Sequence, residues 1–228
     1  MAKIKVLVNG ACGRMGQEVV KAISNDDELS LVGEVDILGK NKDLAETIQK
    51  TGAEVVVDFT IPKTIMDNIT IAAENKANVI VGTTGLTESN LEQLKDLANK
   101  TGVNIFVAPN FAIGAVLMMK FSAEAAKYMP NVEIIEMHHD KKLDAPSGTA
   151  IKTADMIKKA SKINTIAIHS VRLPGFVAHQ EVIFGSLGQT LTIRHDSINR
   201  ESFMPGVILA IKKIKSTKGL TYGLEHLL

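Results

Sequence analysis

The residues best suited to chemistry gather between positions 136 and 150, where the chain reads EMHHDKKLDAPSGTA. Two adjacent histidines and two adjacent lysines end a predicted strand, and the chain then passes through Pro146, Ser147 and Gly148 into a predicted helix. Histidine exchanges protons near neutral pH, and cations beside the N–H groups of a helix start bind anions. The segment therefore indicates a site for an anionic ligand; the alternative, a solvated run of charges, does not account for the histidines and helix start occurring together.

A second group of residues is typical of nucleotide binding. Gly10, Gly13 and Gly16 lie between the first predicted strand and the first predicted helix, spaced G-x-x-G-x-x-G in VNGACGRMGQ. Such a turn lets backbone approach a pyrophosphate at the helix N-terminus, and an acidic residue ending the second strand, here Asp36, binds the adenosine ribose. An ordinary glycine turn is the alternative, but the position between strand and helix favours a dinucleotide.

The cofactor preference stays open at this stage. Asp36 favours NADH because a carboxylate repels a 2′-phosphate, and Ile37 offers no countercharge, whereas Arg14 is able to pair with that phosphate. Cys12 is interpreted as a small side chain beside the cofactor and not as a nucleophile. The cofactor-binding prediction comprises the glycine turn, Asp36 and two later loops: Gly10, Ala11, Cys12, Gly13, Arg14, Met15, Asp36, Gly82, Thr83, Thr84, Ala108, Pro109, Asn110 and Phe111.

Alternating strands and helices must position this cofactor site. Strands are predicted at 3–8, 29–36, 54–59, 79–82 and 104–108, and helices at 17–23, 44–50, 63–75 and 88–100, with Thr87 or Ser89 as a cap. Near-continuous apolar strands in this alternation predict a Rossmann-like, doubly wound parallel sheet. The loops after 79–82 and 104–108 follow strand carboxyl ends, where ligands bind; a plain loop cap is the alternative reading of Thr83 and Thr84.

The pattern changes after Pro109. A helix is predicted at 115–128, strands at 132–138, 165–171, 180–184 and 189–194, and one further helix at 149–160. Short turns between strands favour an α+β domain whose mixed sheet is covered by helices on one face. A final helix at 205–215 is expected to return to the first domain, so the predicted domains are 1–109 with 204–228 and 110–203, hinged near Asn110 and near 202–205.

Composition excludes several functional classes. The 228 residues carry 26 basic and 25 acidic side chains, a net charge of +1, so no polybasic nucleic-acid or membrane surface is expected. A single cysteine, Cys12, and no signal-like start favour the cytoplasm. No apolar run reaches the ~20 residues of a membrane span. His169, His179, His195 and His226 show no metal-ligand spacing, so no metal is predicted.

Five segments together resemble the dihydrodipicolinate reductase family. They are NGACGRMG, DFT at 58–60, GTTGL at 82–86, APNFAIG at 108–114, and the HH…K…DAPSGTA segment. The resemblance implies NADH- or NADPH-dependent reduction of 4-hydroxy-tetrahydrodipicolinate to tetrahydrodipicolinate in lysine and diaminopimelate biosynthesis, by a homotetramer of a dinucleotide domain and a substrate and oligomerisation domain. Cys12 and Ile37 depart from residues that are common in the family, and the chain is shorter than many members.

The resemblance also implies roles for the basic segment. His138 is the implied proton donor or acceptor and Lys142 the implied second acid, while His139, Gly148 and Thr149 contact a carboxylate of the small dicarboxylate substrate. Proton transfer to the charge that develops on hydride addition fits these residue types, although the residues do not decide how His138 and Lys142 divide it. The alternatives are an amino-acid dehydrogenase of the aspartate or homoserine type, which does not explain DAPSGTA, and a non-catalytic dinucleotide sensor.

Overall fold

The computed structural model describes residues 2–228, which form two compact units. One unit runs up to Phe111 and resumes at Phe203–Leu228; the other comprises Ala112–Ser202. The roles expected for the two domains remain predictions. Within residues 2–228, none of the helices is long and apolar enough to cross a bilayer.

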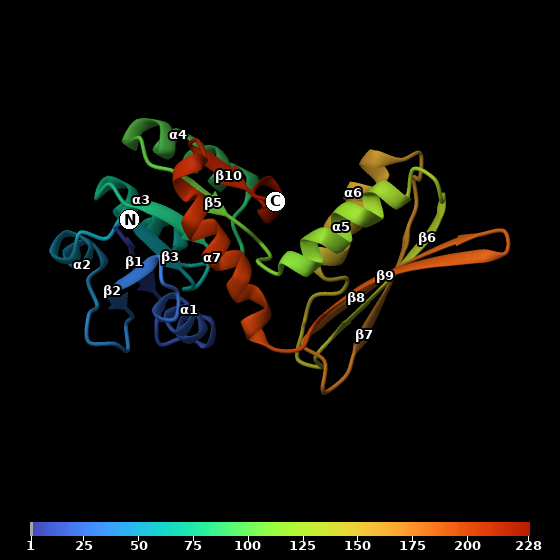
Figure 1. Ribbon diagram of the computed structural model, residues 1–228, viewed down its shortest axis with the longest axis horizontal. Coiled ribbons are helices and arrows are strands. Elements are labelled where there is room, and N and C mark those ends of the chain that lie inside the picture. Colours follow the sequence, from blue (N-terminus) through green and yellow to red (C-terminus); the bar gives the residue numbers. More distant parts are fainter. Residues whose placement is uncertain (1) are drawn as a thin grey trace. The chain divides into compact units, whose positions relative to one another are not determined.

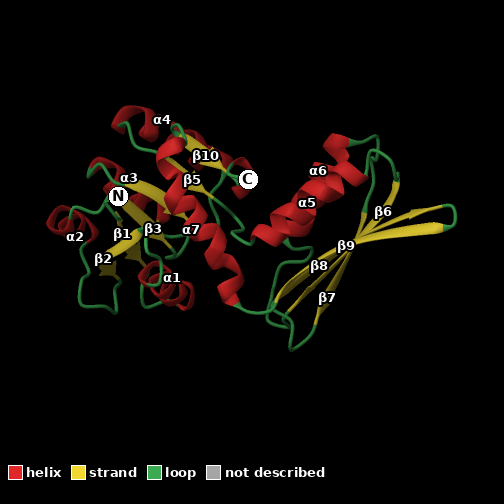
Figure 2. Ribbon diagram, in the orientation of Figure 1, coloured by secondary structure: helices red, strands yellow, loops and turns green. Residues whose placement is uncertain are grey.

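The first unit is built on a parallel sheet of six strands in the order β10-β5-β4-β3-β1-β2 (Figure 2). Its strands are β1 (Ile4–Asn9), β2 (Leu29–Val35), β3 (Val55–Asp58), β4 (Asn78–Val81), β5 (Ile105–Val107) and β10 (Leu220–Tyr222). Its helices are α1 (Arg14–Ser24), α2 (Leu44–Thr51), α3 (Ile65–Glu74), α4 (Glu88–Thr101) and α7 (Met204–Lys213), with short 3-10 turns at Ile214–Ser216 and Leu224–His226. A further 3-10 turn, Arg200–Phe203, spans the boundary between the two units. The expected doubly wound parallel sheet is confirmed.

Chain direction sets the two helical layers of this unit. The step from β1 to β2 runs opposite to the steps from β2 to β3, β4 and β5, so right-handed crossovers place α1 on one face and α2, α3 and α4 on the other. Contacts agree, since α2 packs on α3 and α3 on α4, whereas α7 packs on α1 (Figure 1). The final helix, α7, belongs to the first unit, next to α1.

Three details of this unit differ from the sequence prediction. Thr87 alone caps α4, through a capping box with Asn90, and Ser89 lies inside the helix. The strand β10 was not expected, because three residues are too few to show a period; it extends the sheet by pairing with β5. In addition, α1 begins at Arg14 and therefore includes Gly16 in its first turn.

The second unit carries a mixed sheet of four strands in the order β7-β6-β8-β9. The strands are β6 (Asn131–His138), β7 (Ala167–Arg172), β8 (Ala178–Ser186) and β9 (Gln189–Ser197), and the helices are α5 (Ile113–Ala125) and α6 (Gly148–Ala160). The pair β6 and β7 is parallel and the others are antiparallel. The helices pack on each other and contact β9 and β6, as expected for an α+β layer; α5 ends three residues earlier than predicted.

Candidate active site

The glycine turn of the first unit is too tight for side chains. Gly10 adopts a φ of +84°, and a Cβ there would lie 2.6 Å from the Phe59 carbonyl oxygen. A Cβ on Gly16 would lie 2.0 Å from the carbonyl oxygen of Gly10. The turn therefore brings β1, α1 and the chain after β3 into contact, which requires glycine at both positions.

The surroundings of this turn fit a dinucleotide. The N-cap of α1, Gly13, supplies no side-chain cap, and the N–H groups of a first helical turn are suited to bind an anion. Asp36 directly follows β2, and its carboxylate accepts hydrogen bonds from the backbone N–H groups of Cys12 (3.0 Å) and Leu38 (2.9 Å). A carboxylate has about four acceptor positions, so Asp36 retains capacity for ribose hydroxyls. The donor set and the glycine cradle thus suit the group predicted from sequence.

A buried carboxylate, Asp58, joins the ends of three neighbouring strands. Asp58 is 1% exposed and accepts hydrogen bonds from Asn9 Nδ2 at the end of β1 (2.7 Å) and from Thr83 Oγ1 after β4 (3.0 Å). It also accepts from the backbone and hydroxyl of Thr60 and from Asn68 Nδ2 of α3. The loops that follow β1, β3 and β4 are therefore tied at one point, at the edge where strand order reverses.

The remaining predicted cofactor residues lie at the same carboxyl edge of the sheet. The ring of Phe59 fills the space beside Gly82, where a Cβ would approach it to 2.1 Å. Phe59 also packs against Phe111, with ring centroids 5.9 Å apart. Thr84 and Pro109 are exposed at this edge, whereas Thr83 and Ala108 are buried. The parallel sheet therefore brings the predicted set together.

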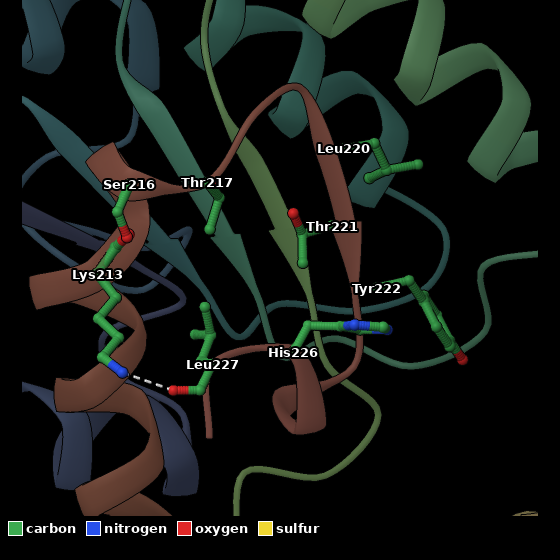
Figure 3. A pocket seen from close by; sticks show the side chains of 8 residues that line it. All are labelled: Lys213, Ser216, Thr217, Leu220, Thr221, Tyr222, His226 and Leu227. Carbon is green, nitrogen blue, oxygen red and sulfur yellow. Dashed lines mark hydrogen bonds between the residues drawn. The ribbon is translucent and has the colours of Figure 1, made fainter.

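A separate depression of about 470 Å³ lies elsewhere in this unit, beside the edge strand β10 (Figure 3). Its lining includes Thr221, Tyr222 and His226, and the ammonium of Lys213 donates to the Leu227 carbonyl there. The strands β5, β4 and β3 separate β10 from β1 in the sheet. The depression therefore does not belong to the glycine-turn site.

In the second unit, the predicted proton-transfer residue His138 ends β6 and is held by a buried carboxylate. The side chain of Glu136 is fully buried and contacts His138 Nδ1 at 2.5 Å. Arg172, the last residue of β7, binds both oxygens of Glu136, at 2.6 and 2.9 Å. Parallel pairing sets Arg172 directly beside His138. The site therefore contains a linked series of hydrogen bonds, Arg172–Glu136–His138, that the sequence did not predict.

The ionisation of this chain follows from its contacts. Burial opposes ionisation of Glu136, but hydrogen bonds from Arg172, Ser170 and His138 outweigh it and hold the pKa of Glu136 below its usual value. Burial lowers the pKa of His138, and the charges of Lys142 and Arg172 lower it further against the opposing effect of Glu136. At neutral pH, Glu136 is therefore ionised and His138 is predominantly neutral.

The loop after β6 carries the other predicted residues. Lys142 Nζ lies 2.7 and 2.8 Å from the two carboxylate oxygens of Asp144, and the hydrogen bond from Lys142 is the main reason that the pKa of Asp144 is lowered. Arg172 also donates to the Asp144 carbonyl at 2.9 Å, which ties the loop to β7. His139 is exposed, and its carbonyl accepts from the Lys142 N–H. The loop therefore keeps His138, His139 and Lys142 on one turn of chain.

The helix start beyond this loop completes the cluster. Ser147 caps α6 through a hydrogen bond from the Ala150 N–H (3.2 Å), and its own N–H donates to Glu136 (3.2 Å). Gly148 and Thr149 occupy the first two positions of α6, and Gly148 has open space where a Cβ would stand. Their N–H groups face the end of the helix, where anions bind.

Sequence reasoning assigned no role to Glu136, Arg172 or Asp58. The sequence did contain one signal for Glu136. Glu136 lies two positions after Ile134, on the same buried face of β6, and a carboxylate on a buried face requires hydrogen-bond partners. No signal marked Arg172, since its contact with Glu136 spans 36 residues of sequence.

Family models for the N-terminus and C-terminus of dihydrodipicolinate reductase match residues 4–111 and 114–228. The chain belongs to the dihydrodipicolinate reductase family. A 4-hydroxy-tetrahydrodipicolinate reductase from Desulfitobacterium hafniense is 45% identical over the full length of both chains. The dipicolinate-bound dihydrodipicolinate reductase from Paenisporosarcina sp. TG-14 is 40% identical, with a TM-score of 0.91 over 99% of this chain and 100% of that one.

Family membership confirms the predicted oxidoreductase with a dinucleotide-binding domain. An aspartate dehydrogenase from Thermotoga maritima is only 13% identical, with a TM-score of 0.53 over 94% of this chain and 97% of that one, and shares the fold alone. The family result therefore favours the reductase over the amino-acid dehydrogenase and the sensor.

Proposed function

We propose that this protein reduces 4-hydroxy-tetrahydrodipicolinate to tetrahydrodipicolinate, with release of water, in lysine and diaminopimelate biosynthesis. The observation that carries the proposal is the cluster of His138, His139 and Lys142 beside the start of α6 in a chain of this family. This arrangement suits a small dicarboxylate with a reducible carbon–nitrogen bond. The dipicolinate bound to the structure from Paenisporosarcina is likewise a small dicarboxylate.

We assign the acid–base chemistry to His138 and Lys142. A reduced nicotinamide supplies the hydride when bound. Addition of hydride to a conjugated imine develops negative charge that a proton must neutralise, and a positioned side chain contributes about 10²–10⁴-fold to such a step. Lys142, a cation held by Asp144, donates a proton in this assignment, and the predominantly neutral His138 exchanges protons through the ring nitrogen that Glu136 does not contact.

We assign substrate recognition to His139, Gly148 and Thr149. The N–H groups at the first positions of α6 hold a carboxylate in the favourable field of the helix start. The exposed ring of His139 adds a donor on the same turn of chain. An anionic substrate thereby explains a basic cluster in a protein whose net charge is only +1.

We assign dinucleotide binding to the glycine turn, Asp36 and the loops after β4 and β5. Gly10–Met15 surround the pyrophosphate, and Asp36 accepts from the adenosine ribose. The two residues after Asp36, Ile37 and Leu38, are both more than 80% exposed and carry no charge to pair with a 2′-phosphate, which favours NADH. Arg14 is exposed at the start of α1 and supplies the charge that NADPH would use. We therefore expect both cofactors to bind, with NADH preferred.

We further propose that the protein is a cytoplasmic homotetramer assembled through the second unit. Helices of residues 112–202 cover one face of the β7-β6-β8-β9 sheet. By strand register, Ile135, Met137 and Ile183 share the other face, where they are only partly buried. Burial of such a face drives association. Light scattering tests this, and a monomer at assay concentration would contradict it.

A coupled assay tests the function. Pyruvate and aspartate semialdehyde are supplied with the preceding synthase, this protein is added, and nicotinamide absorbance is followed with NADH and NADPH separately. Oxidation that depends on the synthase product is expected. Dinucleotide binding without such oxidation would overturn the proposal and favour a sensor.

A further inference from the structure

The Arg172–Glu136–His138 chain differs from an ordinary buried ion pair in how its hydrogen-bonding capacity is used. Both oxygens of Glu136 are engaged by Arg172, and one also accepts from the Ser147 N–H. Burying a carboxylate without partners is very costly, so this many donors is what permits Glu136 to be fully buried and ionised. Arg172 fixes the carboxylate in one orientation because its guanidinium is a rigid fork.

An ionised carboxylate only accepts hydrogen bonds. The Nδ1 atom of His138, 2.5 Å from Glu136 Oε2, must therefore carry a proton. In a neutral imidazole the other nitrogen, Nε2, is then unprotonated. The tautomer of His138 thus follows from the charge of a residue two positions earlier on the same strand.

We propose that Glu136, clamped by Arg172, is a positioning residue that holds His138 in the Nδ1–H tautomer and so presents Nε2 for proton exchange with the substrate. This inference rests on the proposed role of His138. Arg172 is also linked to the second proposed proton-transfer group. Its guanidinium donates to the carbonyl of Asp144, and the carboxylate of Asp144 accepts a hydrogen bond from Lys142. One guanidinium thereby sets the geometry of both assigned proton-transfer groups.

The charged groups around His138 determine how its titration responds. Glu136 attracts the proton, whereas Lys142 on the following loop and Arg172 on β7 repel it, and Asp144 offsets part of the charge of Lys142. Replacing Glu136 by a neutral residue leaves the two cations facing His138. The His138-dependent limb of the pH profile of kcat/KM therefore moves to lower pH in Glu136→Gln.

The first test is the tautomer itself, read in the unmodified protein from two-bond ¹H–¹⁵N spectra with resonances assigned by His138→Gln. The Nδ1–H form is expected for His138 at neutral pH, and the Nε2–H form would overturn the proposal whatever the variants do. This readout needs no turnover, so it separates failure of this inference from failure of the proposed function, which the coupled assay reports.

The second test is kinetic. Glu136→Gln is expected to lower kcat by about a hundredfold or more, the usual contribution of a positioned acid–base group, with the shifted pH limb and with NADH affinity unchanged. Arg172→Lys keeps the positive charge without the forked guanidinium, so its kcat should fall less than that of Glu136→Gln. Glu124→Gln, an exposed carboxylate paired with Lys127, is the matched control and should keep full activity. A folded Glu136→Gln protein with the pH profile and tautomer of the unmodified protein would refute the positioning role.

Discussion

Removing the carboxylate of Asp58 should have two effects at once. The first unit should unfold at a lower temperature, and the affinity for the dinucleotide should fall. In Asp58→Ala, Asn9 and Thr83 lose the acceptor that satisfies them, and these residues are only 5% and 7% exposed. An unsatisfied buried donor costs about 1–3 kcal/mol, so two cost about 2–6 kcal/mol. At about 2–4 °C per kcal/mol for a chain of this size, the unfolding midpoint should fall by roughly 4–24 °C.

The same substitution frees the ends of β1 and β4, which lead into the glycine turn and the Gly82–Thr84 loop. NADH affinity should fall at least about tenfold, the equivalent of ~1.4 kcal/mol. Circular dichroism gives the midpoint and NADH fluorescence titration gives the affinity. Asp58→Asn, which keeps one acceptor oxygen, should lie between Asp58→Ala and the unmodified protein.

Asp96→Ala is the matched control, because Asp96 is exposed on α4 and its loss should change stability by no more than about 0.5 kcal/mol. If Asp58→Ala matched this control in both midpoint and NADH affinity, the reasoning that Asp58 ties the three strand ends would be refuted.

Four further substitutions test the proposed site and the stability of the fold. Lys142→Ala should lower turnover by about 10²-fold or more with NADH affinity nearly unchanged, and unaltered turnover would remove Lys142 from the site. Asp36→Ala should weaken NADH more than NADPH in parallel titrations, so that an equal loss would defeat the ribose assignment. Gly16→Ala should abolish NADH binding, since its Cβ would stand 2.0 Å from the Gly10 carbonyl oxygen; a stable variant with normal affinity would contradict the tight turn. Burial lowers the pKa of His195 in the folded protein. Its contribution to stability is therefore complete above the unfolded pKa of about 6.5 and is lost as the pH falls through the lower folded pKa, at up to about 1.36 kcal/mol per pH unit. In urea unfolding, the free energy of unfolding of His195→Gln should decline less steeply with falling pH than that of the unmodified protein, and identical declines would show that His195 does not contribute to the acid sensitivity.

Local patterns in the sequence were sufficient to predict most of the helices and strands and the segments that carry the proposed site residues. Near-continuous apolar runs such as 55–58 and 105–107 marked buried parallel strands, and glycines after β1 and in the first turn of α1 marked a tight turn with no space for a Cβ at Gly10 and Gly16. The carboxyl ends of parallel strands meet at one edge, so the predicted cofactor residues were brought together once the sheet formed. Such signals are readable because period, turn chemistry and caps depend on neighbours within a few residues.

Contacts across strands were beyond these patterns. Arg172 reaches Glu136 only because β7 pairs in parallel with β6 in a register that sets Arg172 beside His138. Asp58 gathers donors from β1, α3 and the loop after β4, and β10 joins the sheet more than 100 residues after its partner β5. Register is a property of the whole buried sheet and not of any one strand. The sequence alone therefore identified the types of the reacting side chains. The partners that set the orientation and charge of those side chains could be identified only from the tertiary structure, because strand pairing brings them together.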